Sequence, residues 1–377
     1  MSQVKLGDVA VESRETYKGD KTGMPIVGLE HITPGEVTLS NWDTDTDNTF
    51  TKRFRKGDML FGRRRAYLKK AAQAPFDGIC SGDITVIRAK EDCMLPELLP
   101  FIIQNDNLFD FAVGKSAGSL SPRVKWDNLK NYTFELPSME KQKKLAEVLW
   151  SINDTLQAYQ NLLTQTDALV QAQFVEMFDN VSDGDYIPLE KCCASIQGGS
   201  TPSMKHDEYY GGNIPFIKSG DVKDEYVSSG ALWLTEKALK NTTAKYVPEG
   251  TVIVVVRSGI LKNSLPVAIA SNPVVINQDL KAFIPKPEFT SQYLAWAIRS
   301  NENKLLSMTR AMTVDNIESR ELYSLPIKVA PIDLQHKFEF FVEQADKSKS
   351  TLQNTITSLQ TTNRCILENA LGTGRKE

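Results

Sequence analysis

The strongest constraint on this chain is an apolar seam that occurs twice in the same register. The seam residues of the first copy alternate four and three positions apart: Leu145, Leu149, Ile152, Leu156, Tyr159, Leu163, Thr166 and Val170. Adding 193 to each number gives a second copy that continues to one further position: Phe338, Val342, Ala345, Lys349, Leu352, Ile356, Leu359, Asn363 and Ile366. This alternation is typical of coiled-coil helices. The repeat predicts two long helices that pair with each other.

An antiparallel pairing would relate the two halves of the chain by a pseudo-twofold axis. One register sets Leu145 opposite Ala370 and the polar Thr166 opposite the polar Lys349. Polar residues in a seam cost stability but fix the register. The alternative, in which each helix packs separately on its own globular domain, stays open.

The repeat extends into the roughly 140 residues that precede each helix. Pro25-Ile26-Val27 matches Pro215-Phe216-Ile217, and the stretch Cys80 to Ile84 matches Ile276 to Leu280. We therefore predict an α+β fold with a pseudo-twofold internal repeat: two similar mixed α/β domains separated by two long helices that form an antiparallel coiled coil. The predicted boundaries are 1–137 for the first domain, 138–180 for the first helix, 181–330 for the second domain, 331–371 for the second helix and 372–377 for a tail.

Composition agrees with an ordinary protein of about two domains. The chain has 377 residues, of which 41% are hydrophobic and 24% charged. It has no apolar run long enough to cross a bilayer and no signal-peptide core after Met1, which predicts a cytoplasmic protein. Five cysteines without paired metal spacing and three scattered histidines predict reduced structural thiols and no metal site.

One stretch is strongly basic although the net charge is −3. Nine lysines and arginines lie between Thr51 and Lys70, against the single acid Asp58. Such a run is either a solvated charged hairpin or a surface that contacts phosphates and base edges. Phe54, Phe61 and Tyr67 within it are expected to pack in the core. The second copy is less basic, but Arg257 occupies the position equivalent to Arg64.

Apolar runs predict the main secondary structure of each domain. Strands are expected over 58–66, 84–88, 251–257 and 280–284, and short helices over 98–105 and 291–299. The glycines of Tyr210-Gly211-Gly212-Asn213 predict a loop.

Catalytic signatures fail on inspection. Gly114-Lys115-Ser116 resembles the end of a phosphate-binding loop, but Phe109 stands where that motif needs its first glycine. Glu302 and Lys304 have a spacing common in nucleases but lack a suitable upstream aspartate. The absence of a cofactor or metal motif favours a binding protein, while a methyltransferase or nuclease complete in one chain and a coiled-coil scaffold remain as alternatives.

Longer segments carry a family resemblance. The stretch ELPSMEKQKKLAEVLWSIND from Glu135, its echo KVAPIDLQHKFEFFVEQAD from Lys328, and the openings VKLGDVAVES and IPLEKCCASIQGGSTP resemble type I restriction-modification specificity subunits. The segment FRKGDMLFGRRR from Phe54 resembles an internal strand of that family's target recognition domains. The resemblance covers nearly the whole chain, although His336-Lys337-Phe338 departs from the pattern at the second helix.

The resemblance implies a non-catalytic subunit that binds double-stranded DNA. Each target recognition domain would read one half of a bipartite asymmetric site, and the helices would set the spacer and dock two methyltransferase subunits. S-adenosylmethionine would belong to those partners, which would methylate adenine, and the chain itself would hold no cofactor. Restriction subunits are possible further partners under the same resemblance.

Basic residues of the two domains are the expected DNA contacts. Those of the first domain are Arg53, Arg55, Arg63, Arg64, Arg65, Lys69, Lys115 and Arg123, and those of the second are Lys218, Arg257, Lys262 and Arg310.

Overall fold

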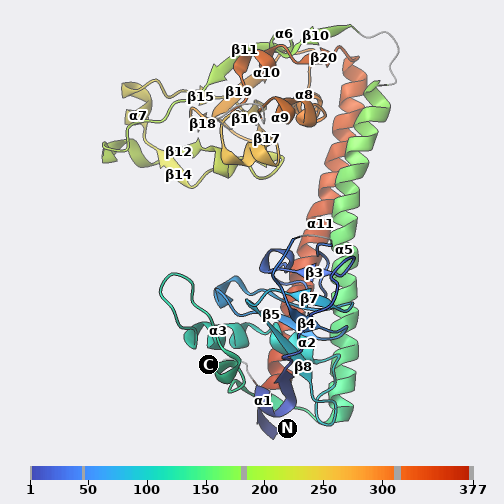
Figure 1. Ribbon diagram of the computed structural model, residues 1–377. Coiled ribbons are helices and arrows are strands. Elements are labelled where there is room, and N and C mark those ends of the chain that lie inside the picture. The colour runs from blue at the N-terminus through green and yellow to red at the C-terminus, as the bar shows by residue number, and fades with distance from the viewer. Residues whose placement is uncertain (1, 45–46, 180–184, 310–315, 373–377) are drawn as a thin grey trace. The chain divides into compact units, whose positions relative to one another are not determined.

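The computed structural model describes residues 2–44, 47–179, 185–309 and 316–372 and contains two compact units (Figure 1). The first unit comprises Met1–Leu162 with Leu352–Glu377, and the second comprises Leu163–Thr351. Helix α5 (Met139–Asp179) and helix α11 (Ile332–Leu371) each contribute a segment to both units. Each unit is therefore one globular domain together with adjoining parts of both long helices.

The first globular domain is built from three small sheets. A two-stranded sheet pairs β1 (Ser2–Lys5) with β9 (Thr133–Leu136) in antiparallel fashion. A four-stranded sheet has the order β2 (Ala10–Glu12), β8 (Ile84–Ala89), β5 (Met59–Gly62) and β6 (Ala71–Gln73). A three-stranded sheet has the order β3 (Ile26–Val27), β7 (Gly78–Cys80) and β4 (Lys52–Phe54).

The second globular domain repeats this topology and adds two strands. β10 (Tyr186–Pro188) pairs with β20 (Pro326–Lys328). The next sheet has the order β11 (Cys193–Gly198), β19 (Leu280–Pro285), β16 (Val252–Val255), β17 (Val267–Ala270) and β13 (Tyr226–Val227). The last has the order β14 (Leu232–Leu234), β12 (Tyr210–Ile217), β18 (Val274–Ile276) and β15 (Tyr246–Val247). The two domains thus share one strand order, as expected of a duplicated unit.

Short helices follow the strands at matching places. The first domain has α1 (Leu6–Val9), α2 (Leu99–Ile103), α3 (Asp106–Gly114) and α4 (Trp126–Leu129), with 3-10 turns η1 (Leu29–His31) and η2 (Ala66–Leu68). The second has α6 (Leu189–Cys192), α7 (Glu236–Asn241), α8 (Ser291–Arg299), α9 (Glu302–Thr309) and α10 (Ser319–Tyr323), with η3 (Asp207–Tyr209), η4 (Ser219–Asp221) and η5 (Gly259–Lys262). None of the described helices is long and apolar enough to cross a membrane.

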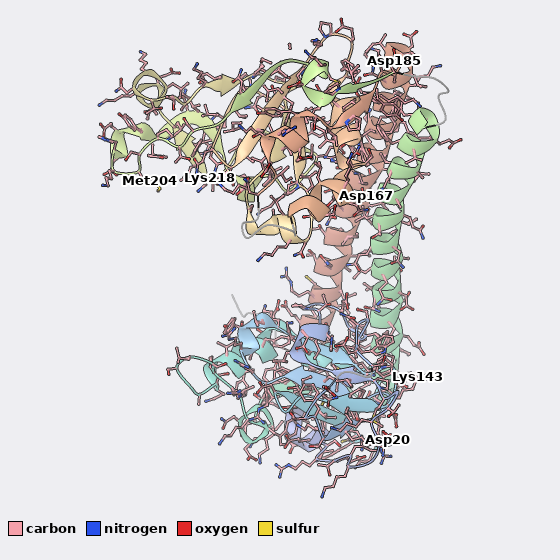
Figure 2. All side chains as sticks on the ribbon, turned by 45° about the horizontal axis from the view of Figure 1, so that its top comes forward. Asp20, Lys143, Asp167, Asp185, Met204 and Lys218 are labelled. Carbon is pink, nitrogen blue, oxygen red and sulfur yellow. The ribbon has the colours of Figure 1, made fainter. Side chains whose placement is uncertain are left out.

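Segments of the two long helices pack against each other within each unit and run in opposite directions. In the first unit Leu149 of α5 shares a buried cluster with Leu367 and Leu371 of α11. In the second unit the Phe338 ring lies 5.3 Å from the Phe174 ring. There Lys349 Nζ also lies 3.1 Å from an oxygen of Asp167, which is labelled on α5 in Figure 2. Every predicted seam residue is buried or half-buried in its unit.

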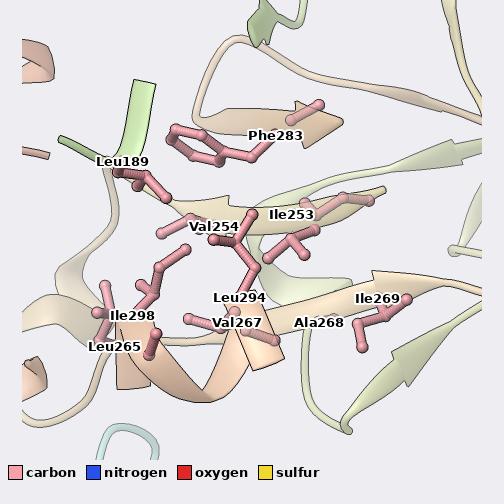
Figure 3. Packing of buried hydrophobic residues seen from close by; sticks show 14 of the residues in the cluster. Leu189, Ile253, Val254, Leu265, Val267, Ala268, Ile269, Phe283, Leu294 and Ile298 are labelled. Carbon is pink, nitrogen blue, oxygen red and sulfur yellow. The ribbon is translucent and has the colours of Figure 1, made fainter. Parts of the chain in front are cut away.

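The core of the second domain shows why the apolar run after Gly250 forms a strand. Residues Val252 to Val255 of β16 are all fully buried, because β17 and β19 pair with both edges of the strand and helix α8 covers one face. Figure 3 shows Leu294 and Ile298 of α8 packed toward this sheet. A continuous apolar run is what a strand buried on both faces requires.

Two local predictions are wrong. The strand expected over 58–66 ends at Gly62, because the chain turns into η2 (Ala66–Leu68). The loop expected at Tyr210–Asn213 is instead the start of β12, where Tyr210 and Ile214 both pair with Leu234. The extra residues form an irregularity in the strand, a common place for strand glycines.

A buried glutamine fastens the start of each long helix to its own domain. The Gln142 side chain accepts a hydrogen bond from Leu95 N at 2.9 Å and donates to the carbonyls of Cys93 and Pro137. The Gln335 side chain, 193 positions later, accepts from Thr290 N at 2.8 Å and donates to the carbonyls of Glu288 and Ala330. Both residues are at most 1% exposed. Each amide therefore satisfies three backbone groups where the helix meets the domain.

Replacement of Gln142 by methionine should destabilise the first unit. The change keeps the side-chain length but leaves a buried N–H and two buried carbonyls without partners, which should lower the free energy of unfolding by about 3 kcal/mol. Calorimetric melting of the full chain would measure the loss. The control Gln165→Met, at an exposed helix position, should melt like the wild type, and equal melting of both variants would refute the role given to Gln142.

Cysteines at positions 152 and 363 should crosslink in the predicted antiparallel register. Ile152 and Asn363 are both half-buried in the first unit, and the exposed Cys365 would first be replaced by serine. Oxidation should give a reducible band of altered mobility on electrophoresis. A pair at Ile152 and Ile356 should fail, because seven residues displace the partner by about 10 Å along the helix. Crosslinking of the control pair alone would show a different register.

Candidate nucleic-acid interface

The basic stretch of the first domain ends in a tight turn after β5. Arg63 N donates to Asp83 O at 2.9 Å and Arg65 N donates to Pro122 O at 2.8 Å, so the turn is held on both sides. Arg65 and Lys69, which flank η2, have φ values of 53° and 51°. Left-handed backbone costs roughly 1–2 kcal/mol for such residues. The surrounding contacts must therefore impose the shape of this turn.

Asp83 binds two of the predicted DNA contacts at once. Its carboxylate accepts from Arg123 Nε at 2.7 Å and from Arg64 Nη1 at 3.4 Å. The hydrogen bond from Arg123 holds the pKa of Asp83 below its ordinary value. Asp83 is 22% exposed, whereas the Arg64 and Arg123 side chains are 40% and 42% exposed. The acid lies on the inner side and the two guanidinium groups lie toward solvent.

The second domain has the same arrangement with one arginine. Arg257 Nε donates to Asp279 at 2.7 Å, and the Arg257 side chain is 50% exposed. The buried Asn277 donates to the other oxygen of Asp279 at 2.9 Å. Backbone bridges join Arg64 to Arg123 in the first domain and Arg257 to Asn316 in the second. Asn316 therefore takes the place of Arg123.

Three other predicted contacts have acidic partners within the first domain. Arg53 pairs with Asp77 at 3.3 Å, Arg55 with Glu15 at 3.0 Å, and Lys69 with Asp106. Arg55 shares Glu15 with Arg88, which also binds the buried Asp58. Part of the positive charge is thus neutralised within the domain, and these side chains are held in position by their acidic partners.

The remaining predicted contacts differ in their surroundings. Arg63 is half-buried, and its Nε has no hydrogen-bond partner among the described residues. Arg65 and Lys262 are exposed, the latter at the end of η5. Lys115 directly follows α3, with its ammonium 5.8 Å from the Phe111 ring centroid. The half-buried Lys218, labelled in Figure 2, follows β12. Arg310 lies outside the described residues.

Three apolar side chains close in sequence to these arginines are exposed, which the sequence did not reveal. Phe54 and Phe61 are fully buried, but Tyr67 is 54% exposed, so its predicted place in the core is wrong. It lies on η2. Ile260 on η5 is 42% exposed at the equivalent position, and Leu120 is 91% exposed next to Ser121, the hydroxyl that accepts from Arg64. The same turn in both domains thus has an exposed apolar residue three positions after an arginine.

The buried thiols are poor nucleophiles. Burial raises the pKa of Cys80, Cys192 and Cys193 to about 12, so they stay protonated near neutral pH. Across the described residues, no group of three or more metal-binding side chains lies together.

Comparison with protein families matches this chain over most of its length. The model of the type I restriction modification DNA specificity domain matches residues 1–165 and again residues 192–359. The two matches correspond to the two halves of the internal repeat.

Curated relatives resemble parts of the chain. It is 33% identical over 163 residues to the EcoR124I/EcoR124II specificity subunit of Escherichia coli. The aligned region covers 42% of this chain and 39% of that protein. It is 30% identical over 175 residues to the MjaIX specificity subunit of Methanocaldococcus jannaschii, covering 43% and 40%. The chain therefore matches about two fifths of the length of these relatives.

Solved structures share the fold along nearly the whole chain. One is a chain from a study of complex assembly and conformational transition of the type I R-M system, with a TM-score of 0.61, 22% identity, and coverage of 98% of this chain and 97% of that one. Another is the type I restriction-modification S subunit of M. genitalium, with a TM-score of 0.58, 11% identity, and coverage of 98% and 96%. With the duplicated topology and the two family matches, these findings show that the chain belongs to the family of type I restriction modification DNA specificity domains.

Proposed function

We propose that this chain is the DNA-reading specificity subunit of a type I restriction-modification complex. Each globular domain reads one half of a bipartite asymmetric site on double-stranded DNA. The chain performs no catalysis itself. S-adenosylmethionine binds to partner methyltransferase subunits, which modify adenine, and the complex works in the cytoplasm, where it meets the cell's DNA.

The observation that carries the proposal is the duplicated arginine turn. Arg64 and Arg257 occupy the same place after β5 and β16, each bound to an acid of the adjacent loop and each about half exposed. Arginine can bind the acceptor edge of guanine or two phosphate oxygens bidentately. A chain with two such turns has one reading surface per domain, which suits a site with two separate halves.

The long helices suit the remaining roles. They have 41 and 40 residues, which corresponds to about 60 Å each. Much of their surface remains exposed outside the seam, and we assign it to the docking of two methyltransferase subunits, with restriction subunits as further partners. A coiled-coil scaffold would leave the arginine turns without a role, and a complete methyltransferase or nuclease is unlike the specificity subunits that the chain resembles.

Co-expression with a type I methyltransferase subunit tests the proposal. The two proteins should purify together and methylate adenines at a single bipartite sequence in a plasmid library, as mapped by sequencing of modified bases. The purified chain alone should methylate and cleave nothing. Failure to co-purify, together with no sequence-preferring DNA binding, would favour the scaffold, and activity of the chain alone would favour an enzyme.

Helix length should set the number of unread base pairs between the half-sites. Four residues added to each long helix lengthen it by about 6 Å, which corresponds to one or two base pairs at about 3.4 Å each. Mapping of modified sites should then show both half-sites unchanged but farther apart. Alanine at four exposed positions of α5, with no change in length, serves as the control. An unchanged spacer in the lengthened variant would exclude this role.

A further inference from the structure

We propose that Asp83 and Asp279 are positioning residues that orient the DNA-reading arginines and thereby determine sequence discrimination in each half-site. The inference rests on the proposed function and deepens it, because it assigns the discrimination to an acidic side chain in each domain.

Each of these arginines uses some of its guanidinium N–H groups on partners within its own domain and keeps others for a ligand. Arg123 uses Nε and Nη2 on Asp83, while Arg64 uses Nε on Ser121 and Nη1 on Asp83. Arg257 uses Nε on Asp279. A guanidinium carries five N–H donors, so donors remain on each group after these bonds. The remaining donors belong to half-exposed side chains and can reach a base or a phosphate.

Orientation matters more for reading a base than for binding a phosphate. A bidentate contact to guanine requires the guanidinium to lie in the plane of the base edge, whereas attraction to the phosphate backbone is sequence-independent. A free arginine has many rotamers and must lose them on binding. An arginine that a carboxylate already holds in one rotamer loses less conformational entropy on binding, which is the advantage of preorganisation.

The negative charge of these two aspartates means that they do not serve to attract DNA. Asp83 and Asp279 each add a negative charge at a surface proposed to face phosphates, and so they weaken long-range attraction to DNA. Both are nevertheless placed at the same turn of the repeated fold, each 22% exposed and directed at an arginine. In the second domain the buried Asn277 holds the carboxylate in turn.

The two halves differ in the number of arginines that the acid holds. Asp83 binds Arg64 and Arg123, whereas Asp279 binds Arg257 and has Asn316 at the second position. Loss of Asp83 should therefore disturb two contacts in one half-site, and loss of Asp279 one contact in the other.

Asp83→Asn and Asp279→Asn in the co-purified complex test the assignment. The probes are duplexes that carry the mapped site, the site with either half replaced, or unrelated sequence. Removal of a negative charge should leave the affinity for unrelated DNA equal or slightly higher, with a salt dependence that is not reduced. Discrimination should nevertheless fall about tenfold, for Asp83→Asn in one half-site and for Asp279→Asn in the other.

Asp127→Asn is the control, since Asp127 also pairs with a basic side chain of the first domain, Lys130, but is 69% exposed and its partner is not an expected DNA contact. It should leave discrimination intact. Should Asp83→Asn unfold, Asp83→Glu keeps the charge and moves the carboxylate, and it should still reduce discrimination without changing the salt dependence.

Four results would decide against the assignment or against the proposed function. Higher affinity for all duplexes with unchanged discrimination would show that Asp83 only offsets charge. Equal weakening at both half-sites would show a structural role. Wild-type complex without sequence preference would overturn the proposed function itself, whereas a normal wild type with unaffected variants would overturn only the role of the acids.

Discussion

The rest of the structure depends on how each long helix is joined to its domain, and a buried side-chain amide makes that joint. Gln142 and Gln335 each satisfy one backbone N–H and two carbonyls at the point where a domain ends and a helix begins. A buried backbone group without a partner costs about as much as several ordinary contacts contribute. The start of each helix is therefore fixed on its own domain. Such a fixed attachment is what the proposed role of the helices in setting the spacer would require.

The candidate interface is built from cations that are held in place. Several arginines in the basic stretch have acidic partners in the same domain, including Arg53 with Asp77 and Arg55 with Glu15. Exposed ion pairs of this kind add little to stability, so their main effect is on side-chain position. A surface of anchored arginines favours discrimination among sequences over tight binding to any DNA. The overall charge of −3 agrees with that balance.

The two domains share a topology but differ at the candidate interface. Arg65 of the first domain has a left-handed backbone, whereas Ser258 at the equivalent place is extended. Arg123 is replaced by Asn316, and Tyr67 by Ile260. The strands beneath these turns pair in the same order in both domains. A common scaffold with different turn residues is the arrangement that would let one fold read two different half-sites.

The sequence by itself determined the duplication, the two long helices and the central buried strands. Their signals are periodic and local, because one face of a helix or both faces of a strand must be apolar over consecutive turns or residues. The sequence also showed that the first domain is basic around Arg64. Only the tertiary structure decided which charges meet: Asp83 lies 40 positions from Arg123, and Tyr67 turned out to face solvent. Such pairings depend on strand register and on turns whose shape is set by residues distant in sequence, such as the hydrogen bond of Arg65 with Pro122. No local sequence pattern predicts them.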